Sequence, residues 1–316
     1  MVEEASSEYT RCFCWPFHFY EGITIQTIII TDLDGTLLHP KTYSFEAARP
    51  ALIHIKERRI PLILCSSKTR GEIELYRKWL ENRHPFISEN GGGIFIPRKY
   101  FEFPVKGELQ KDYTTINLGM PYDKLRDVLM KIREGLGIKV RGFGDMNVKE
   151  VADLAGMSLF EAELAKKRDF DEPFVFEEGE LRVEEFLKAV DTQRARRALR
   201  GRLHPALPVE GATQAPKIEE AGLHWTQGRF FHILGDSDKG KAIKILKDLY
   251  EKAYGKIKTI GLGDGLNDLP LLQEVDYPVL VQKEDGRYET RIDLPGLIRA
   301  DGIGPEGWAN AVMGLI

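Results

Sequence analysis

One short stretch, residues 27–38, constrains the fold more than any other part of the chain. It begins with a run of β-branched residues, Thr27 to Thr31, and continues into a polar turn that holds Asp32, Asp34 and Gly35. This order predicts a buried strand that ends in a loop. In open parallel sheets chemistry gathers beyond the carboxyl ends of the strands, so the two aspartates lie where a site is expected. Two carboxylates this close both ionise readily only beside a cation, or else one keeps its proton. The pair therefore suggests a metal site with one nucleophilic oxygen and one proton-transfer group.

Two simpler interpretations compete for this stretch. A calcium-binding EF-hand loop that began at Asp32 would need a ligand at its fifth position, glycine at its sixth and glutamate at its twelfth. Those positions hold Thr36, Leu37 and Tyr43, so this interpretation fails. An ordinary turn rich in aspartate and glycine remains the alternative for the isolated segment.

The composition limits the class of protein and its partners. With 316 residues, 42% hydrophobic and 30% charged, the chain resembles an ordinary soluble globular protein of two domains, or of one domain with a large insertion. A net charge of -4 gives no argument for nucleic acid, and no apolar run is long enough to cross a bilayer, so we expect neither partner. Cys12, Cys14 and Cys65 make no disulfide framework, which favours a reducing compartment and a cytoplasmic location.

The remaining pattern alternates strands and helices on both sides of a looser middle segment. Apolar strands are predicted at 60–65, 85–88, 229–234, 256–262 and 277–281, and amphipathic helices at 45–58, 71–80 and 241–254. This alternation predicts an α/β fold, a doubly wound parallel-sheet (Rossmann-like) core over residues 23–105 and 229–316. The middle, 106–228, predicts an inserted α+β domain.

Two segments fall outside this plan. Residues 1–22 are polar and then densely aromatic, and we expect a disordered or loosely docked extension; a metal site of Cys12, Cys14 and His18 is the alternative. Residues 194–202 carry five arginines, which favours a solvated helix end and loop over a phosphate-binding patch.

Four short motifs carry a resemblance to a known family. They are Asp32-Leu33-Asp34-Gly35-Thr36, Ser66 after the second strand, Lys239-Gly240 at the start of a late helix, and Gly263-Asp264-Gly265-Leu266-Asn267-Asp268. In this order they resemble the motifs of the haloacid-dehalogenase superfamily, and the inserted domain resembles the cap of its sugar phosphatases. Residues 65–69, 88–92, 168–174 and 263–272 are similar to the mannosyl-3-phosphoglycerate phosphatase family. The likeness spans about residues 25–316, apart from the loop near 191–216.

The resemblance implies a Mg²⁺-dependent phosphatase that acts on a small phosphorylated sugar derivative. It assigns Asp32 as the nucleophile that becomes an aspartyl-phosphate, and Asp34 as the group that protonates the leaving alkoxide and then deprotonates water. The Asp34 backbone carbonyl and the carboxylates of Asp32 and Asp264 would hold Mg²⁺. Ser66 and Lys239 would bind the phosphoryl oxygens.

The resemblance assigns the remaining candidates less sharply. Asn90 either faces the substrate or only forms a turn, and Arg168 either contacts the anionic glycerate end or makes a surface salt bridge. Asp268 either supports Asp264 and Lys239 from behind, contacts the metal directly, or stabilises a helix N-terminus. His232, inside an apolar strand, is expected to be a satisfied core residue rather than a catalyst.

Three other functions remain open at this stage. The chain could be a phosphatase of sucrose phosphate or trehalose phosphate, or a phosphotransferase or mutase that returns the phosphoryl group to another hydroxyl. A catalytically silent module that binds sugar phosphates is the third. The presence of all four residues Asp32, Asp34, Lys239 and Asp264 argues against a module without catalytic activity. Monomer and homodimer are both compatible with the sequence.

Overall fold

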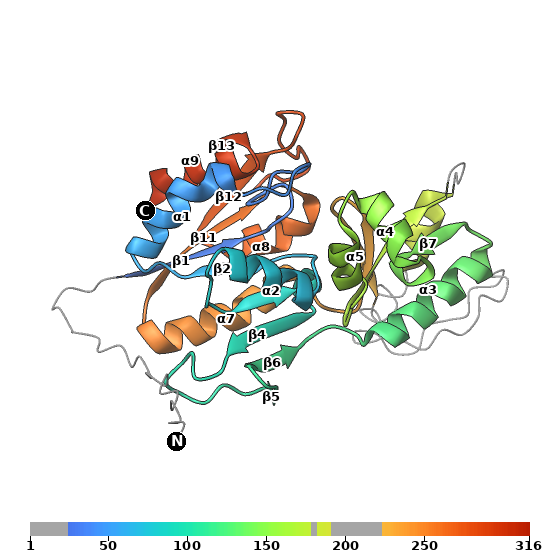
Figure 1. Ribbon diagram of the computed structural model, residues 1–316, viewed down its shortest axis with the longest axis horizontal. Coiled ribbons are helices and arrows are strands. Elements are labelled where there is room, and N and C mark those ends of the chain that lie inside the picture. The colour runs from blue at the N-terminus through green and yellow to red at the C-terminus, as the bar shows by residue number, and fades with distance from the viewer. Residues whose placement is uncertain (1–24, 178–181, 191–222) are drawn as a thin grey trace, which may run out of the picture.

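The chain folds into two lobes, a larger core and a smaller cap (Figure 1). The structure is a computed structural model that describes residues 25–177, 182–190 and 223–316. The extension at 1–22, with Cys12, Cys14 and His18, and the arginine-rich stretch at 194–202 therefore lie outside the described residues. No helix in the described part of the chain is long and apolar enough to cross a membrane.

The core is built on a sheet of nine strands within the described residues. In spatial order these are β13 (Ile298–Ile303), β12 (Tyr277–Gln282), β11 (Ile257–Gly263), β1 (Gln26–Thr31), β2 (Leu62–Cys65), β3 (Phe86–Ser88), β4 (Gly93–Pro97), β6 (Tyr113–Asn117) and β5 (Glu108–Leu109). The strands from β13 to β3 pair in parallel, and β4, β6 and β5 continue the sheet antiparallel. The predicted α/β class with a mainly parallel core is confirmed.

Helices cover both faces of this sheet. The core helices are α1 (Arg49–Glu57), α2 (Arg70–Trp79), α7 (Lys239–Tyr254), α8 (Leu269–Gln273) and α9 (Pro305–Leu315). Successive residues of a strand point to opposite faces. Ile29 of β1 accordingly packs with α1, α2 and α9, whereas Ile28 and Ile30 pack with α7 and α8. Both faces of β1 are buried, which explains its unbroken run of β-branched residues.

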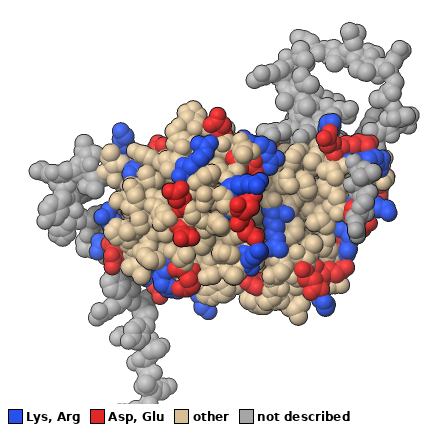
Figure 2. Space-filling model, turned by 90° about the horizontal axis from the view of Figure 1, so that it is seen from above, with Lys and Arg blue, Asp and Glu red and all other residues tan. Residues whose placement is uncertain are grey.

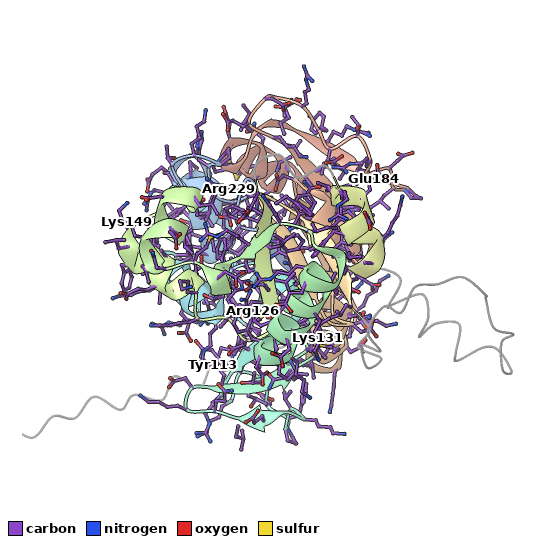
Figure 3. All side chains as sticks on the ribbon, turned by 90° about the vertical axis from the view of Figure 1, so that its right-hand side faces the viewer. Tyr113, Arg126, Lys131, Lys149, Glu184 and Arg229 are labelled. Carbon is purple, nitrogen blue, oxygen red and sulfur yellow. The ribbon has the colours of Figure 1, made fainter. Side chains whose placement is uncertain are left out.

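The cap combines a small antiparallel sheet with helices. Its strands, in spatial order, are β7 (Val140–Gly142), β8 (Asp171–Phe176), β10 (Phe231–Leu234) and β9 (His224–Gln227). Its helices include α3 (Tyr122–Leu136), α4 (Val148–Ala155) and α5 (Leu159–Ala165). On α3, Arg126 (labelled in Figure 3) pairs with Glu172 of β8 at 2.8 Å, so the helix is tied to the sheet by a partly buried ion pair as well as by apolar contacts.

Two strands lie in the other lobe from the one predicted. The strand Tyr113–Asn117 lies within the segment 106–228 that was predicted to form the inserted domain, but it pairs with β4 and extends the core sheet. The strand Phe231–Leu234, predicted within the core segment 229–316, pairs with β8 and β9 of the cap. Both are paired antiparallel with partners that their own sequence does not reveal, because a strand at either place has the same apolar pattern.

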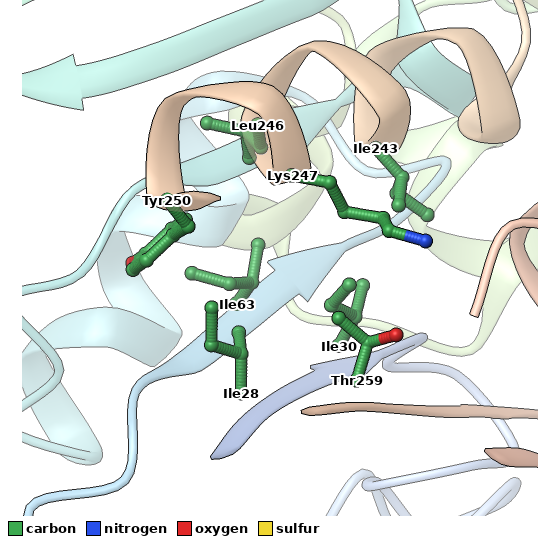
Figure 4. Close-up of a pocket in the computed structure, with 8 residues that line it drawn as sticks. All are labelled: Ile28, Ile30, Ile63, Ile243, Leu246, Lys247, Tyr250 and Thr259. Atoms are coloured by element: carbon green, nitrogen blue, oxygen red, sulfur yellow. The ribbon is translucent and has the colours of Figure 1, made fainter. Parts of the chain in front are cut away.

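A small apolar pocket lies between α7 and the core sheet (Figure 4). Its walls are Ile28, Ile30, Ile63, Ile243, Leu246, Lys247, Tyr250 and Thr259. The charged group among them, the Lys247 ammonium, donates to the backbone carbonyl of Glu274. The pocket therefore belongs to the packing of α7 on the sheet and offers no cluster of reactive groups.

The last helix supports the strand that carries the aspartate pair. Trp308 of α9 is fully buried, and its indole Nε1 donates to Oγ1 of Thr31 at 3.0 Å. Thr31 in turn donates to the backbone carbonyl of Asp32 at 2.7 Å. The end of β1 is thus held from the far end of the chain.

We expect Trp308→Ala to lower the free energy of unfolding by about 3–5 kcal/mol, since it leaves a cavity and removes the indole N–H that donates to Thr31. Met313→Ala on the same helix, where the side chain is half exposed, is the matched control and should change it by less than about 0.5 kcal/mol. Urea unfolding followed by circular dichroism measures both. Equal midpoints for the two variants would contradict this role of Trp308.

Candidate active site

The predicted site residues come from loops at one edge of the core sheet. Asp32 directly follows β1, Ser66 follows β2, and Asp264 follows β11, while Lys239 is the first residue of α7. Because β1, β2 and β11 are parallel neighbours, their carboxyl ends lie together. The topology therefore brings these segments to one place, although 232 positions of the chain separate Asp32 from Asp264.

A buried ammonium group lies between two carboxylates at the centre of the site. Lys239 Nζ is 2.6 Å from Oδ1 of Asp32 and 2.6 Å from Oδ1 of Asp268. All three side chains are buried. Such charges are tolerated away from water only when they are paired, so each member of the trio depends on the others.

Asp264 is held beside this trio by contacts from two directions. Thr36 Oγ1 donates to Oδ1 of Asp264 at 2.9 Å, and Asp268 Oδ2 accepts from the backbone N–H groups of Asp264 and Gly265, at 3.0 Å each. Gly35 has a φ of 78°, and a Cβ added to it would lie 2.8 Å from Oδ2 of Asp264. The glycine in the aspartate motif is thus required both by the turn and by the approach of Asp264.

The acidic side chains fit a divalent cation. Asp32, Asp264 and Asp268 each offer a carboxylate oxygen, and these atoms lie within 4.8 Å of one another. Burial raises the pKa of Asp32, although Lys239 opposes it, and burial together with Asp268 raises the pKa of Asp264 to about 7. One ammonium does not neutralise three carboxylates, and a hard cation with oxygen ligands would supply the missing charge.

The three carboxylates differ in the oxygens that they leave available. Asp268 already accepts from Lys239 with Oδ1 and from two backbone N–H groups with Oδ2, which fits the predicted supporting role. Asp32 and Asp264 are the better-placed ligands. The Asp34 carboxylate is not in this group and turns to Lys68 at 3.0 Å, so a metal contact through the Asp34 backbone carbonyl stays a prediction.

Ser66 and Asn90 lie on adjacent buried loops. Ser66 Oγ accepts from the backbone N–H of Lys68 at 3.2 Å, and its backbone carbonyl accepts from the N–H of Asn90 at 3.0 Å. Asn90 Oδ1 has no hydrogen-bond partner among the described residues. A Cβ added to Gly91 would lie 2.1 Å from the Asp238 carbonyl, so this loop packs directly on the start of α7. The phosphate- and substrate-binding roles of both residues stay predictions.

Comparisons with known proteins identify the family. A model described as haloacid dehalogenase-like hydrolase matches residues 29–113. A glucosyl-3-phosphoglycerate/mannosyl-3-phosphoglycerate phosphatase of Methanococcoides burtonii is 45% identical over 92% of this chain and 97% of its own. A phosphatase of the same name from Persephonella marina is 38% identical over 90% and 95% of the two chains. The chain belongs to the haloacid dehalogenase-like hydrolases, in the family of these two phosphatases.

Solved structures agree on the fold. A protein of Thermoplasma acidophilum shares it with a TM-score of 0.59 at 13% sequence identity, over 92% of this chain and 98% of that one. This hydrolase therefore shares its overall fold with proteins that are distant in sequence.

Arg168 contacts protein groups rather than an open pocket in this hydrolase. Its guanidinium pairs with the carboxylate of Asp171, and it donates to the backbone carbonyls of Asp171 at 2.8 Å and Ser67 at 2.7 Å. The salt bridge considered for Arg168 is thus present, but it is buried and links the cap to the loop after Ser66. A substrate contact of Arg168 stays a prediction. His232 is buried and pairs with Asp171 at 3.1 Å, which confirms the expected core role.

Sequence reasoning missed three buried charges around the site. Lys68 pairs with Asp34. The Asp171 carboxylate pairs with Arg168 and His232 and accepts a hydrogen bond from the side-chain amide of Asn90. The Glu89 carboxylate accepts from three successive backbone N–H groups at residues 169–171, at 2.7–3.1 Å. Their positions in the sequence could have indicated this. Lys68 directly follows Ser66-Ser67, and Asp171 follows Phe170, so both lie within segments already predicted to belong to the site.

Arg168→Met should lower the free energy of unfolding by about 3–5 kcal/mol, because it leaves Asp171 as a buried charge whose strongest partner is gone. The control is Arg141→Met, which breaks the exposed pair with Glu150 and should cost far less stability, because solvent screens an exposed ion pair. Chemical denaturation compares the two. Equal losses in the free energy of unfolding would contradict the structural role of Arg168 and favour its predicted contact with the substrate.

Proposed function

We propose that this chain is a Mg²⁺-dependent phosphatase that hydrolyses mannosyl-3-phosphoglycerate to mannosylglycerate and phosphate through an aspartyl-phosphate intermediate. The observation that carries the proposal is the buried group of Asp32, Lys239, Asp264 and Asp268 at the carboxyl ends of parallel strands. The substrate comes from the names of the relatives, which also include glucosyl-3-phosphoglycerate, so we propose the glucosyl ester as a second substrate.

The first half-reaction belongs to Asp32 and Asp34. Lys239 engages Oδ1 of Asp32, which leaves Oδ2 to attack phosphorus in line with the departing glycerate oxygen. As the bond from phosphorus to that oxygen breaks, Asp34 gives it a proton. Asp34 then takes a proton from the water that attacks the aspartyl-phosphate and releases Asp32.

The phosphoryl group must be held and its charge offset during both steps. General acid catalysis supplies only about 10²–10⁴ of the very large acceleration that phosphate esters need, so positioning and charge stabilisation supply the rest. Lys239 contributes a point charge and Ser66 a hydroxyl donor, with Asn90 facing the substrate. Asp32, Asp264 and the Asp34 carbonyl would hold Mg²⁺, which when bound offsets the repulsion between the nucleophile and the phosphate.

The predicted rivals differ in product rather than in site. A phosphotransferase or mutase would yield an isomeric phosphate ester without free phosphate, and a silent binding module would yield neither. The pairing of Lys239 with two carboxylates favours catalysis, because a module that only binds phosphate has no use for a buried acid that competes for its ammonium.

We further propose a cytoplasmic enzyme that acts as a monomer or homodimer. The location rests on cysteine usage, since Cys65 is a buried free thiol and three cysteines make no framework of disulfides. Light scattering during gel filtration measures the oligomeric state.

A phosphate-release screen tests the substrate. With Mg²⁺ present we expect release from mannosyl- and glucosyl-3-phosphoglycerate at kcat/KM values at least about tenfold above those for sucrose phosphate and trehalose phosphate, a difference of about 1.4 kcal/mol in transition-state binding. Chelation of the metal should remove the activity, and added Mg²⁺ should restore it. Equal rates across the four esters would reject the proposed specificity.

Asp32→Asn should reduce turnover by about 10⁴-fold or more while the protein stays folded, because the amide cannot attack phosphorus but keeps the shape of the carboxylate. Asp248→Asn, on the exposed side of α7, is the matched control and should turn over at the wild-type rate. Phosphate release and thermal unfolding are measured on both. Activity of Asp32→Asn near the wild-type level would refute the nucleophile.

A further inference from the structure

Lys68 is a buried lysine that the proposed mechanism does not use. It follows β2 and is 6% exposed. Its Nζ lies 3.0 Å from Oδ1 of Asp34 and 3.6 Å from Oε1 of Glu72, and 5.1 Å and 5.7 Å from the ring centres of Tyr43 and Tyr76. Two carboxylates and two aromatic faces thus surround one ammonium group, an arrangement that keeps it charged and nearly immobile.

The partners of Lys68 are themselves fixed. Glu72 accepts from the backbone N–H of Thr69 at 2.9 Å and so completes the capping box at the start of α2. Lys68 therefore stands on a rigid helix end and reaches from it to Asp34. The Asp34 side chain is one-third exposed, and the ion pair with Lys68 is the polar contact that the described residues give to its carboxylate.

We propose that Lys68 is a positioning residue that holds the Asp34 carboxyl group in the orientation for proton transfer, an inference that rests on the proposed phosphatase function. Lys68 contacts Oδ1 as an ion pair without the geometry of a hydrogen bond, so its hold on the carboxyl group is electrostatic, and Oδ2 is the oxygen left to carry the transferred proton. Lys68 keeps its own proton throughout: Asp34 loses one to the glycerate oxygen as that oxygen leaves phosphorus, and regains one from the attacking water.

The cap contacts the residue that covers Lys68. The Tyr43 hydroxyl donates to the backbone carbonyl of Ala155 at 3.4 Å, and the guanidinium of Arg229 (labelled in Figure 3) donates to the same hydroxyl. Tyr43 and Lys68 also line a small pocket at the seam with Met157 and Leu164 of the cap. The residue that covers Lys68 is thus fixed by the cap, so the cap helps to shield the Lys68 ammonium from bulk water, while the Asp34 carboxylate stays one-third exposed.

The test compares Lys68→Met and Lys68→Arg with Lys78→Met, an exposed lysine on α2, using the ester that the wild-type enzyme hydrolyses fastest. A misplaced acid costs about a hundredfold in rate, so kcat of Lys68→Met should fall by about 10- to 100-fold while KM and the Mg²⁺ concentration for half-activation stay within about threefold. On a logarithmic scale, Lys68→Arg should recover at least half of the kcat that Lys68→Met loses. Lys78→Met should have the kcat of the wild type.

A double-mutant cycle separates positioning from a general structural effect. In the Asp34→Asn background, Lys68→Met should cause less than about a twofold further loss, because the group through which Lys68 acts is already gone. Full additivity of the two losses would overturn the proposal, and so would a kcat of Lys68→Met within twofold of the wild type or a loss confined to KM.

Two arrangements keep the outcome clear. If the single variant Lys68→Met does not fold, the double variant Lys68→Met with Glu72→Gln takes its place in the same assays. This double variant removes the buried ammonium together with the buried carboxylate of Glu72, so neither charge is left unpaired by the loss of the other. Wild-type turnover across the four esters judges the proposed function on its own. A wild-type enzyme that prefers another ester overturns the substrate and leaves the role of Lys68 to be decided by the variants.

Discussion

The buried ammonium of Lys239 is the contact on which the site depends. It joins the end of β1, the start of α7 and the turn after β11 through two carboxylates that no water screens. A buried ion trio of this kind contributes little net stability, because desolvation offsets most of the Coulomb attraction. What it fixes is geometry. Once Asp264 is counted, three carboxylates face one ammonium, so the fully ionised group is two positive charges short of neutral, and a divalent cation that reaches these oxygens would supply them.

The two lobes meet through polar groups rather than through an apolar interface alone. Figure 2 shows acidic and basic side chains gathered along the line where core and cap join. Below that surface, Glu89 accepts from the backbone of residues 169–171, and Arg168 donates to the carbonyl of Ser67. The core partners belong to the same loops that carry Asn90 and Ser66. The cap is therefore aligned by the segments predicted to bind substrate, and a shift of the cap would also shift them.

The sequence predicts local features well and pairings between distant residues poorly. The strand before Asp32 and the helix α7 follow from apolar runs and adjacent turns; the strand lies where predicted, and the helix predicted at 241–254 begins two residues earlier, at Lys239. The strand Tyr113–Asn117 lies in the segment predicted for the other lobe, because its pairing with β4 is specified by the sheet and not by its own residues. Buried charges are hardest: Glu89 and Asp171 lie 82 positions apart, and alone each resembles a solvated acid.

Asp32 and Asp34 stand two positions apart, yet the fold gives them different environments. Asp32 is almost fully buried against Lys239 of α7, which approaches from the far half of the chain. Asp34 is one-third exposed and faces Lys68, which approaches from the loop after β2. A nucleophile needs a fixed, desolvated oxygen, and a proton-transfer group needs access to the leaving oxygen and to water. The strand places both acids at one edge, and two lysines from different elements separate their roles. Because Lys68 follows β2 and Lys239 begins the helix that leads into β11, the parallel order of β11, β1 and β2 is itself a condition for the chemistry.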